Sequence, residues 1–348
     1  MQRAASGRAT RLQLVLAFAA IYVLWSSTFL AIRYAVAEIP PLLTIAIRCA
    51  AGAGILFAWQ AARGQLTRPT GAQLRTALLA GTVLFLGGHG LLAWAEQRVT
   101  SGQAALWMTT TPLWIVAIGA WLERRAPSPR VLAAVAIGAA GVAILVLGAP
   151  EPRAIQAGAS RAGDSVALER AALAASAMFW AVGSLIGRHG ARPASAIDAT
   201  ALQLAGGALV VCLLSASTGE LAGWSTDRLT ARGIGALAFL IIGGTVLGFG
   251  AYTFLLAATS PVAASTYAFV NPVLALALGW AVGDEPFSPL TAAAGVLVIG
   301  AVVMTHLSSA GSRTIGKRIT SAGAARAVRR ALRPSGGAAR RTPYRRRA

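Results

Sequence analysis

The chain has 348 residues, of which 56% are hydrophobic and only 12% are charged, and its mean hydropathy is +0.65. Soluble domains typically have about 25% charged residues, so this composition excludes an ordinary soluble domain and places most of the chain in lipid. The formal net charge of +20 would suit a nucleic-acid-binding protein, but residues 1–11 and 308–348 are strongly basic tails without an acidic residue. No nucleic-acid-binding module is visible, so we expect no nucleic-acid partner.

Ten apolar segments are long enough to cross a bilayer, for which about 20 residues are needed. The first half of the chain contributes residues 12–36, 42–61, 73–95, 101–121 and 130–148, and the second half contributes 167–188, 195–216, 233–257, 261–282 and 289–307. The first segment resembles a signal peptide, but apolar sequence continues to Val36, so we expect an uncleaved span. The pattern predicts an all-α polytopic membrane protein with ten transmembrane helices.

The two halves of the chain, residues 12–148 and 167–307, repeat each other as five-helix units. The matched positions are Trp25 with Trp180, Arg33 with Arg188, Arg48 with Gln203, Gly81–Leu84 with Gly244–Leu247, Pro112 with Pro272, and Ser128-Pro129 with Ser288-Pro289. Because five is an odd number, a tandem copy inserts with the opposite orientation. Inverted repeats of this kind are common in secondary transporters.

The distribution of arginines predicts the orientation in the membrane. With the N-terminus in the cytoplasm, the inner loops are rich in arginine and the outer loops are balanced or acidic, as at Asp284 and Glu285. The inner arginines are Arg63, Arg68, Arg75, Arg124, Arg125, Arg130, Arg188 and Arg192. We expect a multi-pass protein of the cell (inner or plasma) membrane with both termini cytoplasmic and residues 149–166 as an external linker. The tail 308–348 is expected to be largely disordered, and it is either a solvated orientation signal or a surface for anionic lipid.

Two of the apolar segments are interrupted near their centres, at Pro112 and Pro272. Proline frees a backbone carbonyl, and helices broken at corresponding places of two repeats indicate a transporter's binding site. Polar and aromatic side chains gather near these breaks and in the first spans of each half. The candidates for a substrate cavity are Trp25, Ser27, Thr28, Arg48, His89, Thr110, Thr111, Trp180, Ser184, Tyr267 and Asn271. The alternative for the serines and threonines is that they only join helices to one another.

Three ionisable residues inside or next to the spans have two interpretations each. His89 lies seven residues before Glu96 and therefore on the same helical face, so the pair can relay a proton or can be purely structural. Arg48 lies about two turns into its span. Its guanidinium can bind a substrate carboxylate or can extend outward to the membrane surface.

Signals for enzymatic or nucleotide chemistry are missing from the sequence. There is no GxxxxGK[ST] phosphate loop, and Cys49 and Cys212 fall inside apolar segments at positions that do not match between the halves. No Cys/His cluster suggests a metal, and no Ser, His and Asp arrangement suggests nucleophilic catalysis. We expect no cofactor, no metal and no enzymatic activity.

The order of the spans and several short motifs resemble the drug/metabolite transporter superfamily, and within it the EamA-type exporters. The resemblance covers residues 12–307, and its motifs are Trp25-Ser26-Ser27-Thr28-Phe29, Ala95-Glu96, Ser101-Gly102, Ala104-Ala105, Thr111-Pro112-Leu113-Trp114, Glu123, Ser260-Pro261-Val262-Ala263-Ala264, Asn271-Pro272-Val273, Gly283-Asp284-Glu285 and Pro289. The resemblance implies a central cavity lined mainly by spans 1–4 and 6–9, with spans 5 and 10 outside. It also implies secondary transport that exports small metabolites, such as amino acids, or drugs.

The sequence therefore predicts a secondary active transporter that exports a small metabolite by alternating access through a midplane cavity. Multidrug efflux of cationic or aromatic compounds is the alternative within transport. A non-transporting membrane scaffold and a membrane-embedded enzyme are the alternatives of other classes. The expected partners are a small-molecule substrate and the lipid bilayer, with proton coupling and substrate exchange both open and no oligomeric state indicated.

Overall fold

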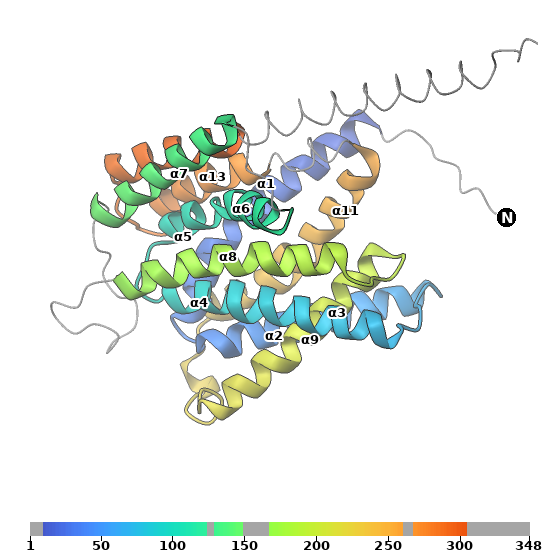
Figure 1. Cartoon of the computed structure of the whole chain (residues 1–348). Coiled ribbons are helices and arrows are strands. Elements are labelled where there is room, and N and C mark those ends of the chain that lie inside the picture. Colours follow the sequence, from blue (N-terminus) through green and yellow to red (C-terminus); the bar gives the residue numbers. More distant parts are fainter. Residues whose placement is uncertain (1–9, 124–128, 149–166, 260–266, 305–348) are drawn as a thin grey trace, which may run out of the picture. The chain divides into compact units, whose positions relative to one another are not determined.

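The structure is a computed structural model that describes residues 10–123, 129–148, 167–259 and 267–304. Within these residues the chain forms helices joined by short connections and contains no β-strand (Figure 1). Six helical segments of the described residues are long and apolar enough to cross a membrane, and shorter apolar helices accompany them. The prediction of an all-α membrane protein is therefore confirmed.

The helices of the first half follow the predicted spans. They are α1 (Arg11–Val36), α2 (Pro41–Ala62), α3 (Gly71–Thr82), the π-helix η1 (Val83–Gly90), α4 (Leu91–Ala95), α5 (Ser101–Met108), α6 (Thr111–Glu123) and α7 (Pro129–Gly148). The elements α3, η1 and α4 form one continuous helical segment. The fourth predicted span is divided into α5 and α6.

The second half repeats this arrangement. Its elements are α8 (Ala167–His189), α9 (Ala196–Ser217), the short 3-10 helix η2 (Thr226–Arg228), α10 (Ala231–Phe239), the π-helix η3 (Leu240–Leu247), α11 (Gly248–Ala258), α13 (Tyr267–Val282) and the helix Pro289–Met304. The start of the predicted span 261–282 and the end of the span 289–307 lie outside the described residues, as do most of the tails and the linker 149–166.

Polar side chains fix where several helices begin. Thr10 and Thr70 each accept a hydrogen bond from the backbone N–H three residues later, and the side-chain oxygens of Gln13 and Gln73 accept one from the backbone N–H of the same threonine, forming capping boxes. Thr100 caps α5 in the same way by accepting from the N–H of Gln103. Such caps satisfy N–H groups that the first helical turn leaves without a partner.

The helices of the two halves pack against each other instead of forming two separate bundles. α2 packs on α9, while α3, η1 and α4 pack on α8, which runs beside them in Figure 1. α1 packs on α10, α11 and α13 of the second half. The main hydrophobic core accordingly contains buried residues of both halves, among them Cys49, Phe85, Leu204 and Leu240.

The fifth helix of one half lies against the last helix of the other. A Cβ atom added to Gly141 of α7 would lie 2.8 Å from Val298 Cγ2, and one added to Gly138 would lie 3.3 Å from Ala301 Cβ. The absence of a side chain at these glycines therefore lets α7 approach the helix Pro289–Met304 closely.

Candidate functional site

Four aromatic residues gather where α1 meets α11 and α13. The Trp25 ring lies 4.7 Å from the Tyr267 ring, 5.3 Å from Tyr252 and 5.7 Å from Phe249, measured between ring centroids. Tyr252 and Tyr267 also contact each other edge to face at 5.8 Å. We call these four residues the Trp25 cluster. Edge-to-face pairs at such distances are favourable contacts that hold rings in defined orientations.

A hydrogen bond between the halves fixes the indole of Trp25. Its Nε1–H donates to the carbonyl oxygen of Gly244 on η3 at 3.0 Å. A Cβ atom at Gly248 would collide with the same indole ring, so this position requires glycine. The π-helix η3 therefore offers a carbonyl to Trp25, and the first residue of α11 offers a backbone without a side chain. π-helical turns are frequent at functional sites.

A second aromatic group forms where η1 meets α8. The His89 ring stacks on Phe85 at 5.6 Å and meets Trp180 edge to face at 4.7 Å, and Phe85 contacts Trp180 at 6.4 Å. We call these three residues the Trp180 cluster. A Cβ atom at Gly88 would lie 3.0 Å from the Trp180 ring, so here too a glycine of a π-helix lies against a tryptophan.

The two clusters share one equivalent pair of rings. Trp25 and Trp180 are separated by 155 residues, and the repeated tetrapeptide Gly-Thr-Val-Leu is separated by 163 residues. The second spacing also aligns His89 with Tyr252. The pairs Trp25–Tyr252 and Trp180–His89 are thus equivalent, and each joins the first helix of one half to the third span of the other. Sequence reasoning missed Tyr252, although extending the spacing of 163 by a few residues would have found it.

Arg48 lies next to the Trp25 cluster and is turned inward. Its side chain is 5% exposed, and its Nε–H donates to the Thr245 hydroxyl on η3 at 3.0 Å. A Cβ atom added to Gly244 would lie 3.5 Å from Arg48 Nη2 and 2.6 Å from Thr28 Cγ2. The alternative in which Arg48 extends to the membrane surface is therefore wrong, because the side chain packs against η3 and is held there by the bond to Thr245.

Comparison with known proteins identifies the family. The model of the EamA-like transporter family matches residues 12–147 and 170–307. The chain belongs to the EamA-like transporter family. It is 30% identical over 292 residues to the uncharacterized inner membrane transporter YedA of Escherichia coli K12, covering 82% of this chain and 88% of that protein. The same match is found for YedA of Escherichia coli O157:H7.

A crystal structure has the same fold as this EamA-like transporter. It aligns with a TM-score of 0.54 and 21% sequence identity, over 86% of this chain and 98% of the other. The protein is therefore a multi-pass membrane transporter with two EamA repeats, as the sequence predicted.

Near the Trp25 cluster, the polar side chains of α1 make mostly local contacts. The Ser26 hydroxyl lies 3.2 Å from Asn271 Oδ1 on α13 and donates to the Tyr22 carbonyl, which links the first helix to the ninth span. Ser27 and Thr28 donate to carbonyl oxygens of their own helix. On α8, Ser184 is half-buried one turn beyond Trp180. Of these residues, Ser26 and Asn271 join elements that are far apart in the sequence.

The threonines before Pro112 complete a helix end. The hydroxyls of Thr109, Thr110 and Thr111 donate to the carbonyls of Ala105, Trp107 and Met108 at 2.8, 2.7 and 2.7 Å. These bonds satisfy carbonyl groups where α5 ends and α6 begins, and all three threonines are buried. Their hydroxyl oxygens can still accept a hydrogen bond from a ligand.

The two prolines differ in their effect on the helices. The helix is interrupted directly before Pro112, whereas α13 continues through Pro272. The predicted break at Pro272 is therefore wrong within the described residues. A proline removes one backbone hydrogen bond, and neighbouring helices allow a membrane helix to tolerate that loss.

At one end of the bundle a carboxylate holds two elements together. Glu285 accepts from the backbone N–H groups of Ser101 at 2.7 Å and Gly102 at 3.2 Å, at the start of α5. Its Oε1 also lies 3.4 Å from Nε of Arg33, which donates to the Val99 carbonyl at 2.5 Å. Glu285 thereby neutralises a mostly buried arginine and caps a helix N-terminus, where negative charge is favoured.

Glu96 is buried close to this ion pair but takes no part in it. Among the described residues, neither Glu96 carboxylate oxygen nor Nδ1 of His89 has a hydrogen-bond partner, so the predicted His89–Glu96 relay has no direct bond in this structure. Burial, reinforced by the Glu285 carboxylate and partly offset by Arg33, raises the pKa of Glu96 well above its usual range. Glu96 is therefore protonated over a wider pH range than an ordinary glutamate.

We expect Glu96 to make the transporter less stable as pH rises. The unfolded chain ionises at the lower, ordinary pKa, so between the two pKa values the folded state binds more protons and the free energy of unfolding falls with pH. The loss is about 1.4 kcal/mol per pH unit in that window. Thermal unfolding in detergent at about pH 5 and about pH 8 should show a smaller loss for Glu96→Gln than for wild type. Asp227→Asn, at an exposed acid, should keep the wild-type slope, and an equal slope in Glu96→Gln would contradict the assignment.

Proposed function

We propose that this transporter is a secondary active exporter of a small metabolite, which it moves by alternating access about a site between its two halves. In this proposal it lies in the inner or plasma membrane with both termini in the cytoplasm. The observation that carries the proposal is the equivalent pairing of Trp25 with Tyr252 and Trp180 with His89. Each pair joins one half to the other, so a rocking motion of the halves changes both pairs at once.

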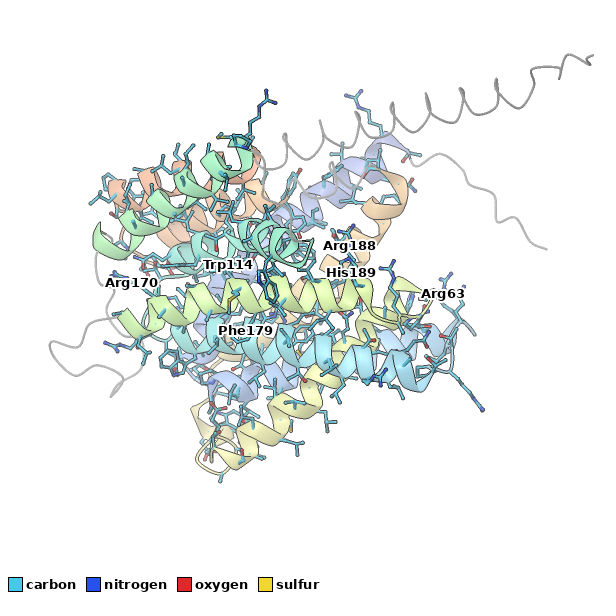
Figure 2. All side chains as sticks on the ribbon, viewed as in Figure 1. Arg63, Trp114, Arg170, Phe179, Arg188 and His189 are labelled. Carbon is cyan, nitrogen blue, oxygen red and sulfur yellow. The ribbon has the colours of Figure 1, made fainter. Side chains whose placement is uncertain are left out.

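A difference between the equivalent arginines supports alternating access. Arg33 is partly buried and paired with Glu285, whereas its counterpart Arg188 is exposed near the end of α8. Figure 2 shows Arg188 and His189 at that end of α8, with Arg170 near the other end. In a transporter built from an inverted repeat, equivalent residues of the two halves make different contacts in any one conformation. The change between the inward-open and outward-open conformations exchanges these contacts between the halves.

Multidrug efflux remains the second candidate because the aromatic clusters favour it. Seven aromatic or imidazole rings lie in the Trp25 and Trp180 clusters, and stacked rings bind flat, apolar compounds without a specific hydrogen-bond pattern. The buried positive charge of Arg48 argues against the cationic members of that substrate class, because like charges repel strongly where water is excluded.

The proposal is tested by counterflow in proteoliposomes, with pooled amino acids, organic acids and dyes as substrates. Trp25→Phe keeps the ring but leaves the Gly244 carbonyl without its donor, which costs about 1–3 kcal/mol and should lower the exchange rate by roughly tenfold or more. Asn271→Ala, which removes the contact with Ser26, should also lower it. The matched control is Trp59→Phe, at a tryptophan of α2 that is 54% exposed.

The outcomes separate the hypotheses. Saturable exchange that is lost in folded Trp25→Phe and kept in Trp59→Phe supports transport through this site. If folded wild type moves nothing from the broad pool, the exporter proposal fails and a scaffold gains support. A pH gradient that accelerates uptake indicates proton coupling, in which His89 and Glu96 are the first residues to test, and no acceleration indicates substrate exchange.

A further inference from the structure

Arg48 is a buried cation whose hydrogen-bonding capacity is only partly used. One of its five N–H donors is satisfied, since Nε donates to the Thr245 hydroxyl at 3.0 Å. Its Nη1 atom is buried and has no hydrogen-bond partner in the described part of the chain. Among the described residues, Arg33 pairs with Glu285 and Arg98 with Glu169, whereas no carboxylate there neutralises Arg48.

The depth of Arg48 excludes an ordinary contact with the aqueous phase or with lipid headgroups. It is the eighth residue of α2, which places its Cα about 10 Å from the start of the helix. Its side chain then runs inward to η3 and is 5% exposed. A charge at such a position is expensive to bury, and it usually faces a partner, a substrate path or a water-filled space.

Gly244 connects Arg48 with the Trp25 cluster. The Gly244 carbonyl accepts a hydrogen bond from the Trp25 indole. The position that a Cβ atom of residue 244 would occupy faces Thr28 and Nη2 of Arg48. A free guanidinium edge and a group of aromatic rings thus meet at one backbone position. Together they offer two N–H donors in a plane for an oxyanion and an apolar surface for the body of a small molecule.

We propose that Arg48 binds the carboxylate of the transported molecule, so that the substrate is a small organic acid with an apolar body and not a cation. The proposal rests on the proposed transport function and names its substrate class. A carboxylate matches the fork of a guanidinium with two parallel hydrogen bonds and neutralises its charge. A purely structural role would need only the single bond to Thr245, for which a neutral residue suffices.

The internal repeat suggests which side chain can replace Arg48 in a test, because the equivalent position of the second half carries a different residue. The counterpart of Arg48 in the second half is Gln203, so only one of the two equivalent positions carries a cation. Arg48→Gln removes the charge and keeps a donor. Arg48→Lys keeps the charge and loses the planar fork. Arg63→Gln, at an exposed arginine near the end of α2, is the matched control for loss of an arginine.

Binding to the purified full-length protein is measured by ligand-induced shifts of the unfolding temperature, followed by tryptophan fluorescence. The ligands are mono- and dicarboxylates of graded size, aliphatic and aromatic, each tested beside its own amide and amine, together with inorganic phosphate. We expect carboxylates, and not their amides or amines, to stabilise wild type and Arg63→Gln. Arg48→Gln should weaken carboxylate binding roughly 30-fold or more, as expected for truncating a buried charged partner, with Arg48→Lys intermediate.

Several outcomes would overturn the assignment of Arg48 as a carboxylate-binding residue. Amines that bind as well as the matched acids, or a folded Arg48→Gln that retains carboxylate binding, would show that Arg48 does not select an anion. The proposal also fails if phosphate alone binds, or if no carboxylate binds while counterflow moves neutral or cationic compounds. In the last case the transport function stands and only the substrate class fails. Conversely, Arg48-dependent carboxylate binding without any counterflow leaves the anion site in place and contradicts the exporter.

Discussion

Replacing Glu285 by alanine is expected to destabilise the protein by about 3–5 kcal/mol, the range for breaking a buried ion pair from one side. The variant leaves the Arg33 guanidinium, whose side chain is 12% exposed, without its partner 3.4 Å away. It also removes the acceptor for the N–H groups of Ser101 and Gly102, at the start of α5. Two penalties thus fall on one substitution, because the same carboxylate neutralises a charge and caps a helix.

Unfolding in mixed detergent micelles, followed by tryptophan fluorescence, measures the effect. The matched control is Asp284→Asn, which makes a similar change of charge at the neighbouring exposed residue. Asp284 has a φ of 52°, a left-handed conformation that asparagine tolerates well, so the control should stay within about 0.5 kcal/mol of wild type. Glu285→Gln should fall between, since an amide oxygen still accepts a hydrogen bond. Equal stability of Glu285→Ala and Asp284→Asn would show that the ion pair contributes nothing.

The sequence could predict the spans well because hydrophobic length is a property of the chain itself. The predicted spans 12–36 and 73–95 correspond to helical segments at Arg11–Val36 and Gly71–Ala95. A bilayer requires a fixed length of apolar helix, so the limits follow from where polar residues begin. The repeat was equally visible, because paired tryptophans, prolines and a shared tetrapeptide survive at nearly constant spacing.

The direction in which a side chain points could not be predicted in the same way. The residues next to Arg48 in the sequence are compatible with a side chain that extends outward and with one that packs on η3. The direction depends on the hydrogen bond to Thr245, 197 residues away. Glu285 looked like an acid of an outer loop, yet it is buried because the start of α5 needs an acceptor. The π-helices were also missed, since an apolar run does not encode which carbonyl each N–H will reach.

The candidate site could be predicted only in part from the sequence. Trp25, Trp180, His89 and Tyr267 were chosen for residue type and depth, and the structure brings them into two ring clusters. Their partners Phe85 and Phe249 were missed, because an aromatic residue in an apolar run gives no sign of its neighbours. Long-range packing between the halves decides these contacts, and a one-dimensional pattern does not contain it.

Gly81→Ala is expected to have the second large effect, because it blocks a close backbone approach of the two halves. A Cβ atom at Gly81 on α3 would collide with the backbone carbonyl oxygen of Gln203 and lie 2.8 Å from the backbone N of Gly207, both on α9. Backbone atoms cannot rotate away as a side chain can, so the helices must separate. Overpacking typically costs about 1–3 kcal/mol, and we expect the upper end of this range or more.

Two other glycines test whether this loss comes from the helix contact. Gly54→Ala on α2 meets nothing within 4 Å and should be neutral or stabilising by up to about 1 kcal/mol, the gain in helix propensity. Gly244→Ala, at the repeat counterpart of Gly81, meets the Thr28 methyl at 2.6 Å, a side chain that can move, and should cost less than Gly81→Ala. Unfolding in mixed micelles gives the order, and a Gly81→Ala variant as stable as Gly54→Ala would contradict the tight α3–α9 contact. Because α3 and α9 belong to opposite halves, a folded Gly81→Ala protein should also exchange substrate more slowly, since any rocking of the halves moves this contact.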